Sequence, residues 1–143
     1  MIPVAWMLSI TLHLMPMERP PEYYLHKFYA DKSLYTQTCS SFPTVDVVLG
    51  DLPGSIIGLC DPRGKVHVVT VSREFWKKAT NLQKEELMYH ELGHCVLGKP
   101  HKEGYVLDGG YLMPASIMKC CGLLGKDYAK YRDYYLWELF EGK

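Results

Sequence analysis

The spacing of apolar residues changes along the chain, and each change marks an expected helix or strand. Runs of β-branched and aromatic residues bounded by turn residues predict three short strands, at residues 44–49, 55–60 and 65–71. The residues between the last two, Asp61-Pro62-Arg63-Gly64, form a strong turn signal. The second and third strands should therefore form a hairpin.

Helical periodicity lies on both sides of these strands. Residues 20–29 begin with proline and place Tyr24, Leu25 and Phe28 on one side of a helix that should cover a face of the sheet. Residues 126–140 predict a closing amphipathic helix. Its apolar side carries Tyr128, Tyr131, Tyr135, Leu136 and Leu139.

A further helix is predicted from Thr80 to Gly98. Thr80 or Asn81 can cap its first turn, and a glycine is typical of a helix end. An apolar stripe should bury it: Leu87, Met88, Leu92, Val96 and Leu97.

The amino terminus is the most ambiguous part of the chain. Residues 4–15 are apolar like the hydrophobic part of a secretion signal, but no Lys or Arg precedes them and no cleavage site follows. About 12 apolar residues are too few to span a bilayer. We expect residues 1–19 to form a helix that docks on this domain or on a partner, with an anchor or a signal as alternatives, and residues 20–143 to form one domain.

Composition narrows the classes of function. The chain has 143 residues, of which 48% are hydrophobic, with 16 basic and 16 acidic side chains. This length suits one domain with a sizeable core. Because no dense basic run is present, we expect no nucleic-acid partner.

The cysteines show no metal-binding or disulfide pattern. Five are present and none lies in a C-x-x-C pair: Cys39, Cys60, Cys95, Cys120 and Cys121. This pattern predicts neither a disulfide framework nor a structural zinc knuckle, and favours a reducing compartment. Cys95 is interpreted as a small buried residue, and a disulfide between the adjacent Cys120 and Cys121 is not expected.

The helix predicted from Thr80 to Gly98 carries the pattern His90-Glu91-Leu92-Gly93-His94. Two histidines four residues apart lie on one face of a helix, so both can bind one ion. Catalytic zinc takes three protein ligands and keeps one position for water. His90 and His94 are predicted to be two ligands, with Glu91 the general base acting on the zinc-bound water.

Three downstream residues are candidates for the remaining ligand. His101 comes first, because Gly98 allows a sharp turn back toward the metal. Asp108 and then Glu103 are the alternatives, since zinc also accepts carboxylate oxygen. Asp108 could instead orient a ligand histidine, or belong to an ordinary turn with the glycines that follow it.

The stretch from His90 to His101 resembles the metzincin zinc peptidases, with one residue more than their H-E-x-x-H-x-x-G-x-x-H spacing. Met113-Pro114-Ala115-Ser116-Ile117-Met118 resembles their methionine turn, with Met118 as the methionine beneath the ligands. The chain is also similar to small bacterial and phage metallopeptidases with H-E-L-G-H-C motifs. The resemblance implies a zincin-like α+β fold. In it, a small mixed sheet of three or more strands packs on the metal helix, with helices at both ends.

The function implied by this resemblance is a zinc metalloendopeptidase. A protein or peptide substrate would lie extended along a sheet edge, at strand 55–60 or 65–71. The tyrosine that some metzincins place two residues after the turn methionine is replaced by Cys120, which leaves Tyr105 and Tyr111 as candidates to stabilise the transition state. The alternative is a non-catalytic protein of the same fold, such as a phage particle component that docks through its apolar amino terminus.

Overall fold

The computed structural model describes residues 18–37 and 41–142. The helices are α1 (Pro21–Tyr35), α2 (Arg73–Lys78), α3 (Asn81–Cys95) and α4 (Lys126–Glu141). The strands are β1 (Thr44–Gly50), β2 (Gly58–Asp61), β3 (Val66–Ser72), β4 (Tyr105–Asp108) and β5 (Tyr111–Pro114). The general prediction of an α+β fold is confirmed. The docking segment predicted at residues 1–19 falls almost entirely outside the described residues.

Strands β1, β3 and β2 form a mixed sheet in that order. β1 runs parallel to β3, whereas β2 runs antiparallel to it with Cys60 opposite Val69. The predicted hairpin is therefore confirmed, although β2 begins at Gly58 rather than at residue 55. Its place in the order puts β2 at an edge of the sheet.

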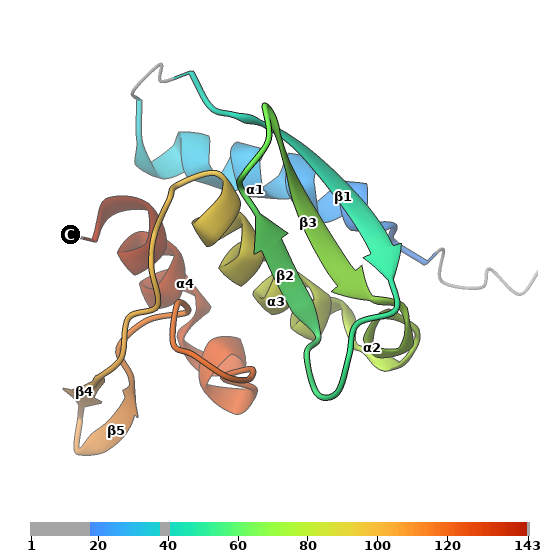
Figure 1. Ribbon diagram of the computed structural model, residues 1–143. Helices are drawn as coiled ribbons and strands as arrows, with labels where there is room; N and C mark the ends of the chain where they lie inside the picture. The colour runs from blue at the N-terminus through green and yellow to red at the C-terminus, as the bar shows by residue number, and fades with distance from the viewer. Residues whose placement is uncertain (1–17, 38–40, 143) are drawn as a thin grey trace, which may run out of the picture.

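The helices cover one face of this sheet. Figure 1 shows α1 and α3 behind the strands, with α4 on the side of α3 away from β1. Val45 and Val47 of β1 alternate with exposed residues, as expected for a strand with one buried face. The fully buried side chains beneath the sheet include Phe28, Met88, Leu92 and Leu139, so residues from three helices share one core.

Helix α3 begins with a capping box. The Thr80 hydroxyl accepts the Gln83 N–H, and the Gln83 side chain accepts the Thr80 N–H. Gly98 lies just past its end at φ +64°, a conformation that favours glycine, and turns the chain back. These contacts confirm the predicted start and stop, so local sequence determines where the histidines lie along the helix.

Buried carboxylates join α3 to α4. Glu85 accepts hydrogen bonds from Tyr128 Oη at 2.7 Å and from Arg132 Nε at 2.5 Å. Glu86 accepts from the backbone N–H of Leu124, just before α4. Burial raises the pKa of Glu86 to about 7, while bonds from the backbone of Leu124 and Gly125 act in the opposite direction. Helix α4 is thus held against the first half of α3.

Three elements were not predicted. Helix α2 lies between the predicted strand at 65–71 and the predicted helix that begins at Thr80, and β4 and β5 form a hairpin after His101, around the turn considered at Asp108. Their turn contains Gly109 and Gly110, both with positive φ, so the turn interpretation of this segment holds. Among the described residues, no helix is both long and apolar enough to cross a membrane.

The expectation of no disulfides is wrong. Cys60 of β2 is bonded to Cys95 of α3, with Cα atoms 5.6 Å apart, and Cys120 is bonded to its neighbour Cys121. Cys95 is buried, as predicted, but it is half of a covalent link between the edge strand and the helix. Spacing along the chain did not reveal this pair because 35 residues separate its members.

Candidate metal centre

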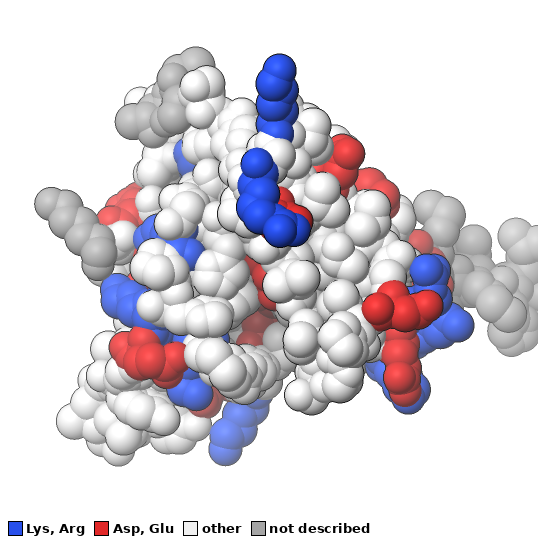
Figure 2. All heavy atoms as spheres, viewed as in Figure 1, with Lys and Arg blue, Asp and Glu red and all other residues white. Residues whose placement is uncertain are grey.

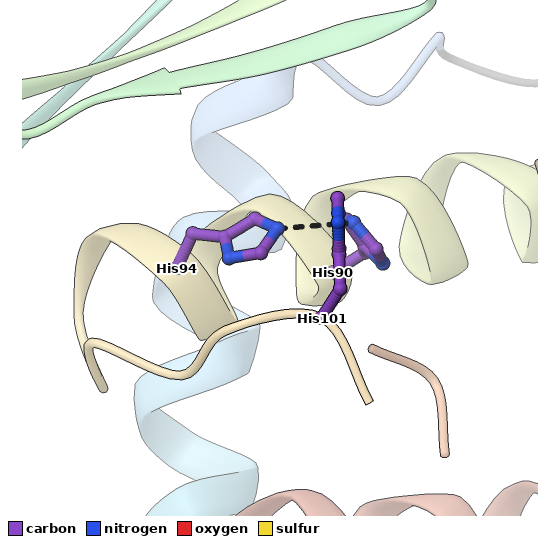
Figure 3. A group of neighbouring side chains, drawn as sticks. All are labelled: His90, His94 and His101. Carbon is purple, nitrogen blue, oxygen red and sulfur yellow. Dashed lines mark hydrogen bonds between the residues drawn. The ribbon is translucent and has the colours of Figure 1, made fainter. Parts of the chain in front are cut away.

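Three histidines converge beside the carboxyl half of α3. His90 and His94 come from one face of the helix, and His101 from the loop that follows the turn at Gly98 (Figure 3). The ring centroids are 4.8 to 5.3 Å apart. Each ring offers one nitrogen, and these three atoms all lie within 4.8 Å of one another. The structure thus brings together the three residues that the sequence suggested as ligands.

Backbone carbonyls orient two of the rings. His90 Nδ1 lies 2.8 Å from the Ile117 carbonyl oxygen, and His94 Nδ1 lies 2.6 Å from that of Lys99. A carbonyl oxygen only accepts, so each Nδ1 must carry the proton. Burial also lowers the pKa of both rings, to about 4 for His90. Both are therefore neutral near pH 7 and direct an Nε2 lone pair at the same point.

That arrangement fits a metal ion. The Nε2 atoms of His90 and His94 are 3.2 Å apart, the contact dashed in Figure 3. With both protons on Nδ1, these lone pairs face each other and repel unless a cation lies between them. Two nitrogens bound to tetrahedral zinc at about 2.05 Å are roughly 3.3 Å apart. The three nitrogen donors, and the spacing of this pair, therefore fit a metal ion such as zinc.

Glu91 lies beside the histidines and is almost fully buried, at 6% exposure. Burial raises the pKa of its carboxyl group to about 7, and a hydrogen bond from the Cys60 backbone N–H acts in the opposite direction. A carboxylate with a pKa near the working pH is suited to accept and return a proton. The structure places this acid against the edge strand β2.

Gly58 of β2 packs closely against the Glu91 side chain. A methyl group there would lie 2.7 Å from Glu91 Oε1 and 2.9 Å from Leu87 Cδ1, closer than such contacts occur. A glycine within a strand can mark either a close backbone approach or a bulge. Close packing against Glu91 is what the structure shows.

We expect Gly58→Ala to displace the Glu91 carboxylate and to lower any Glu91-dependent hydrolysis roughly 10- to 100-fold, since small misplacements of reacting groups cost about this much. Zinc content should not change, because the three histidines are untouched. The matched control is Gly64→Ala in the same hairpin, where the added methyl is 3.2 Å from the Val66 carbonyl oxygen. Unchanged kcat/KM in Gly58→Ala would refute a role for this contact in placing Glu91.

Met118 lies under the helix between the two histidines. It is buried at 1% exposure, and a side chain on Gly93 would overlap its sulfur atom. Only glycine at position 93 allows the turn at 116–119 to come this close to α3. The sequence resemblance suggested this placement of Met118.

Two clefts meet at the site. One, of about 820 Å³, runs past His67 and His94, and the other, of about 520 Å³, runs past Leu87 and Ile117. Both are bordered by Gly58, His90, Glu91 and His101. Figure 2 shows the face that carries β2, with charged side chains mainly around its margin and a largely uncharged middle. The histidines and Glu91 thus border both clefts, beside β2.

The other candidate residues lie elsewhere. Asp108 and Glu103 are not among the described groups able to share an ion with the histidines, and Glu103 accepts a hydrogen bond from the Cys120 backbone N–H. Tyr105 is 60% exposed on β4, and Tyr111 donates to Asp127. Neither tyrosine lines the two clefts.

Sequence reasoning missed several groups at the site. The backbone carbonyls of Lys99 and Ile117 orient the histidine rings, but every residue has a backbone carbonyl. The amino-acid types at positions 99 and 117 therefore could not indicate this role. His67 of β3 lines the larger cleft and bonds through Nδ1 to the Cys95 carbonyl at 2.7 Å. Its position in a strand opposite the metal helix could have suggested a place near the site.

Comparison with known proteins agrees with the geometry. Residues 51–119, just under half of the chain, match the family model described as "Putative phage metallopeptidase". The matched segment runs from just before β2 through α3, His101 and Met118. No curated protein and no solved structure matches the chain. The match supports a metallopeptidase-like family and suggests metal-dependent peptidase activity.

Proposed function

We propose that this protein is a zinc-dependent endopeptidase of zincin-like fold. One observation carries the proposal: the Nε2 lone pairs of two neutral histidines converge beside a third histidine, next to a buried carboxylate whose pKa is raised to about 7. A purely structural zinc site is normally closed by four protein ligands. Among the described residues only three such groups converge here, which favours a catalytic site.

His90, His94 and His101 would hold the ion. Zinc bound there supplies Lewis acidity, polarising the scissile carbonyl and making a water molecule easier to deprotonate. Glu91 accepts the proton of the attacking water on a carboxylate oxygen and then delivers it to the leaving nitrogen. The hydrogen bond from the Cys60 N–H holds the Glu91 side chain for both transfers.

The substrate is proposed to bind along β2 as an added strand. The Cys60 N–H points away from β3 and toward Glu91, and strand alternation turns the backbone of Gly58 the same way. With the Cys60 N–H engaged by Glu91, the Cys60 carbonyl and the backbone of Gly58 could bond the main chain of an extended peptide irrespective of its side chains. The disulfide between Cys60 and Cys95 keeps this edge in register with the metal helix.

Metal removal tests the proposal. Purified protein should contain about one zinc per chain, in line with the single group of three histidines among the described residues. Cleavage of an unstructured protein should stop when a chelator removes the metal and return when zinc is added. Mass spectrometry of the fragments separates this activity from a contaminating protease, because the same sites must be cut before removal and after restoration.

Zinc binding with no cleavage of any unstructured protein would favour the non-catalytic alternative, a structural or docking protein that keeps the metal for stability. Absence of bound zinc would overturn both the peptidase and its metal centre.

A further inference from the structure

Glu138 of α4 is a buried carboxylate outside the histidine cluster, with 5% of its surface exposed. Oε2 accepts a hydrogen bond from the Ser116 hydroxyl at 2.6 Å, and Oε1 forms a salt bridge with Lys102 Nζ at 2.8 Å. Burying a carboxylate is costly, and a salt bridge to a lysine side chain that is 45% exposed adds little net stability. Stability alone is therefore a weak explanation for a glutamate here.

The hydrogen bond between Ser116 and Glu138 connects Glu138 indirectly to His90. The Ser116 hydroxyl, which donates to Glu138, accepts the Met118 N–H at 3.0 Å, and this fixes the turn at 116–119. The turn presents the Ile117 carbonyl to His90 Nδ1. The orientation of the His90 ring thus depends on a turn that is anchored by Glu138.

The salt bridge between Lys102 and Glu138 connects Glu138 to the loop that carries His101. Lys102 is the next residue, and its backbone N–H donates to the Met118 carbonyl at 2.9 Å while its side chain reaches Glu138. Both ends of Lys102 are therefore attached to the same turn and helix. The loop that carries His101 is also held at its two ends, where Lys99 Nζ donates to the Gly142 carbonyl and the Ala115 N–H donates to the Gly104 carbonyl, both at 3.0 Å. Lys102 adds an anchor directly beside His101.

We propose that Glu138 is a positioning residue of the metal centre: through Ser116 and Lys102 it holds His90 and His101 in the geometry that binds the ion. The inference rests on the proposed zinc site. Groups that orient metal ligands typically change metal affinity about 10- to 100-fold when removed. Glu138 should have an effect of this size although it does not touch the ion.

The test is the zinc dissociation constant of Glu138→Gln, measured by competition with a chromophoric chelator. Glutamine keeps the shape and one acceptor but loses the charge that holds Lys102. We expect zinc to bind about 10- to 100-fold more weakly than to the wild type. The matched control is Glu141→Gln on the same helix, where the side chain is exposed; its affinity should stay within about twofold of the wild type.

Thermal unfolding distinguishes positioning from general support of the fold. For each variant, the unfolding midpoint is measured in excess chelator and at a fixed zinc concentration. Loss of support alone lowers both midpoints equally. Loss of positioning reduces the upward shift caused by zinc, because that shift depends on the dissociation constant.

If Glu138→Gln does not fold, Lys102→Met takes its place, since this side chain is 45% exposed and its loss cuts the link between Glu138 and the His101 loop. Weaker zinc binding in a folded variant supports the inference. Wild-type affinity in both Lys102→Met and folded Glu138→Gln overturns it and leaves the proposed function standing. A wild-type protein that binds no zinc overturns the two together.

Discussion

Glu91→Gln should abolish most peptide hydrolysis while leaving zinc bound. Glutamine has the same shape as glutamate but cannot accept a proton, and general-base catalysis contributes about 10²- to 10⁴-fold to rate. We therefore expect kcat/KM to fall by about that factor. Zinc content, measured by elemental analysis, should remain that of the wild type, because the substitution leaves the three proposed histidine ligands unchanged.

The pH profile of the wild type gives a second readout of Glu91. Burial raises its pKa to about 7 in the absence of an ion, and a nearby cation favours the ionised form and lowers that pKa. Only the ionised form is a base. Activity should therefore decline as the pH falls, with a midpoint at or below about 7.

A carboxylate far from the site provides the control for charge loss. Glu74→Gln on α2 removes an exposed side chain that pairs with Lys78, and kcat/KM should stay within about twofold of the wild type, as is usual for surface positions. Full activity in Glu91→Gln would exclude Glu91 as the base.

His101→Ala should lose tight zinc binding. Structural zinc sites bind with about 10 to 16 kcal/mol, and one of three ligands carries roughly a third of such an energy. At about 1.4 kcal/mol per decade, the dissociation constant should rise roughly 10²- to 10⁴-fold. Because His101 is exposed and lies in a loop, the apo protein should unfold at nearly the wild-type temperature.

The two carboxylates considered as alternative ligands are the controls. Asp108→Ala and Glu103→Ala should bind zinc like the wild type, because neither lies with the histidines and Glu103 bonds the Cys120 backbone. Loss of zinc in Asp108→Ala with retention in His101→Ala would reverse the assignment of the third ligand.

Much of the fold was predictable because its signals are local. Helix ends depend on residues only a few positions away in the chain. Examples are the proline at the start of α1, the capping residue Thr80 and the glycine after α3. The β2–β3 hairpin was predictable from its turn. Helix α2 and the β4–β5 hairpin were missed because each is short and lies in a stretch with weak periodicity.

The parallel pairing of β1 with β3 was not predictable in the same way. Both strands are short apolar runs. The residues of such a run do not indicate which strand it pairs with, or whether the pairing is parallel or antiparallel. Which strand lies at the edge, and therefore which could receive a substrate, depends on that pairing. Of the two strands that the sequence left as candidates, β2 lies at an edge of the sheet and β3 lies in its middle.

The sequence by itself determined the metal-binding pattern. Helical geometry puts His90 and His94 on one face with Glu91 beside them, and Gly98 returns the chain so that His101 approaches. Only the tertiary structure decided what surrounds these residues: Gly58 and the Cys60 N–H against Glu91, the disulfide from Cys60 to Cys95, and Glu138 behind the turn at Ser116. The reason is physical, since helix spacing and turns arise within a few residues, whereas burial, pKa and ligand orientation depend on groups brought together from distant parts of the chain.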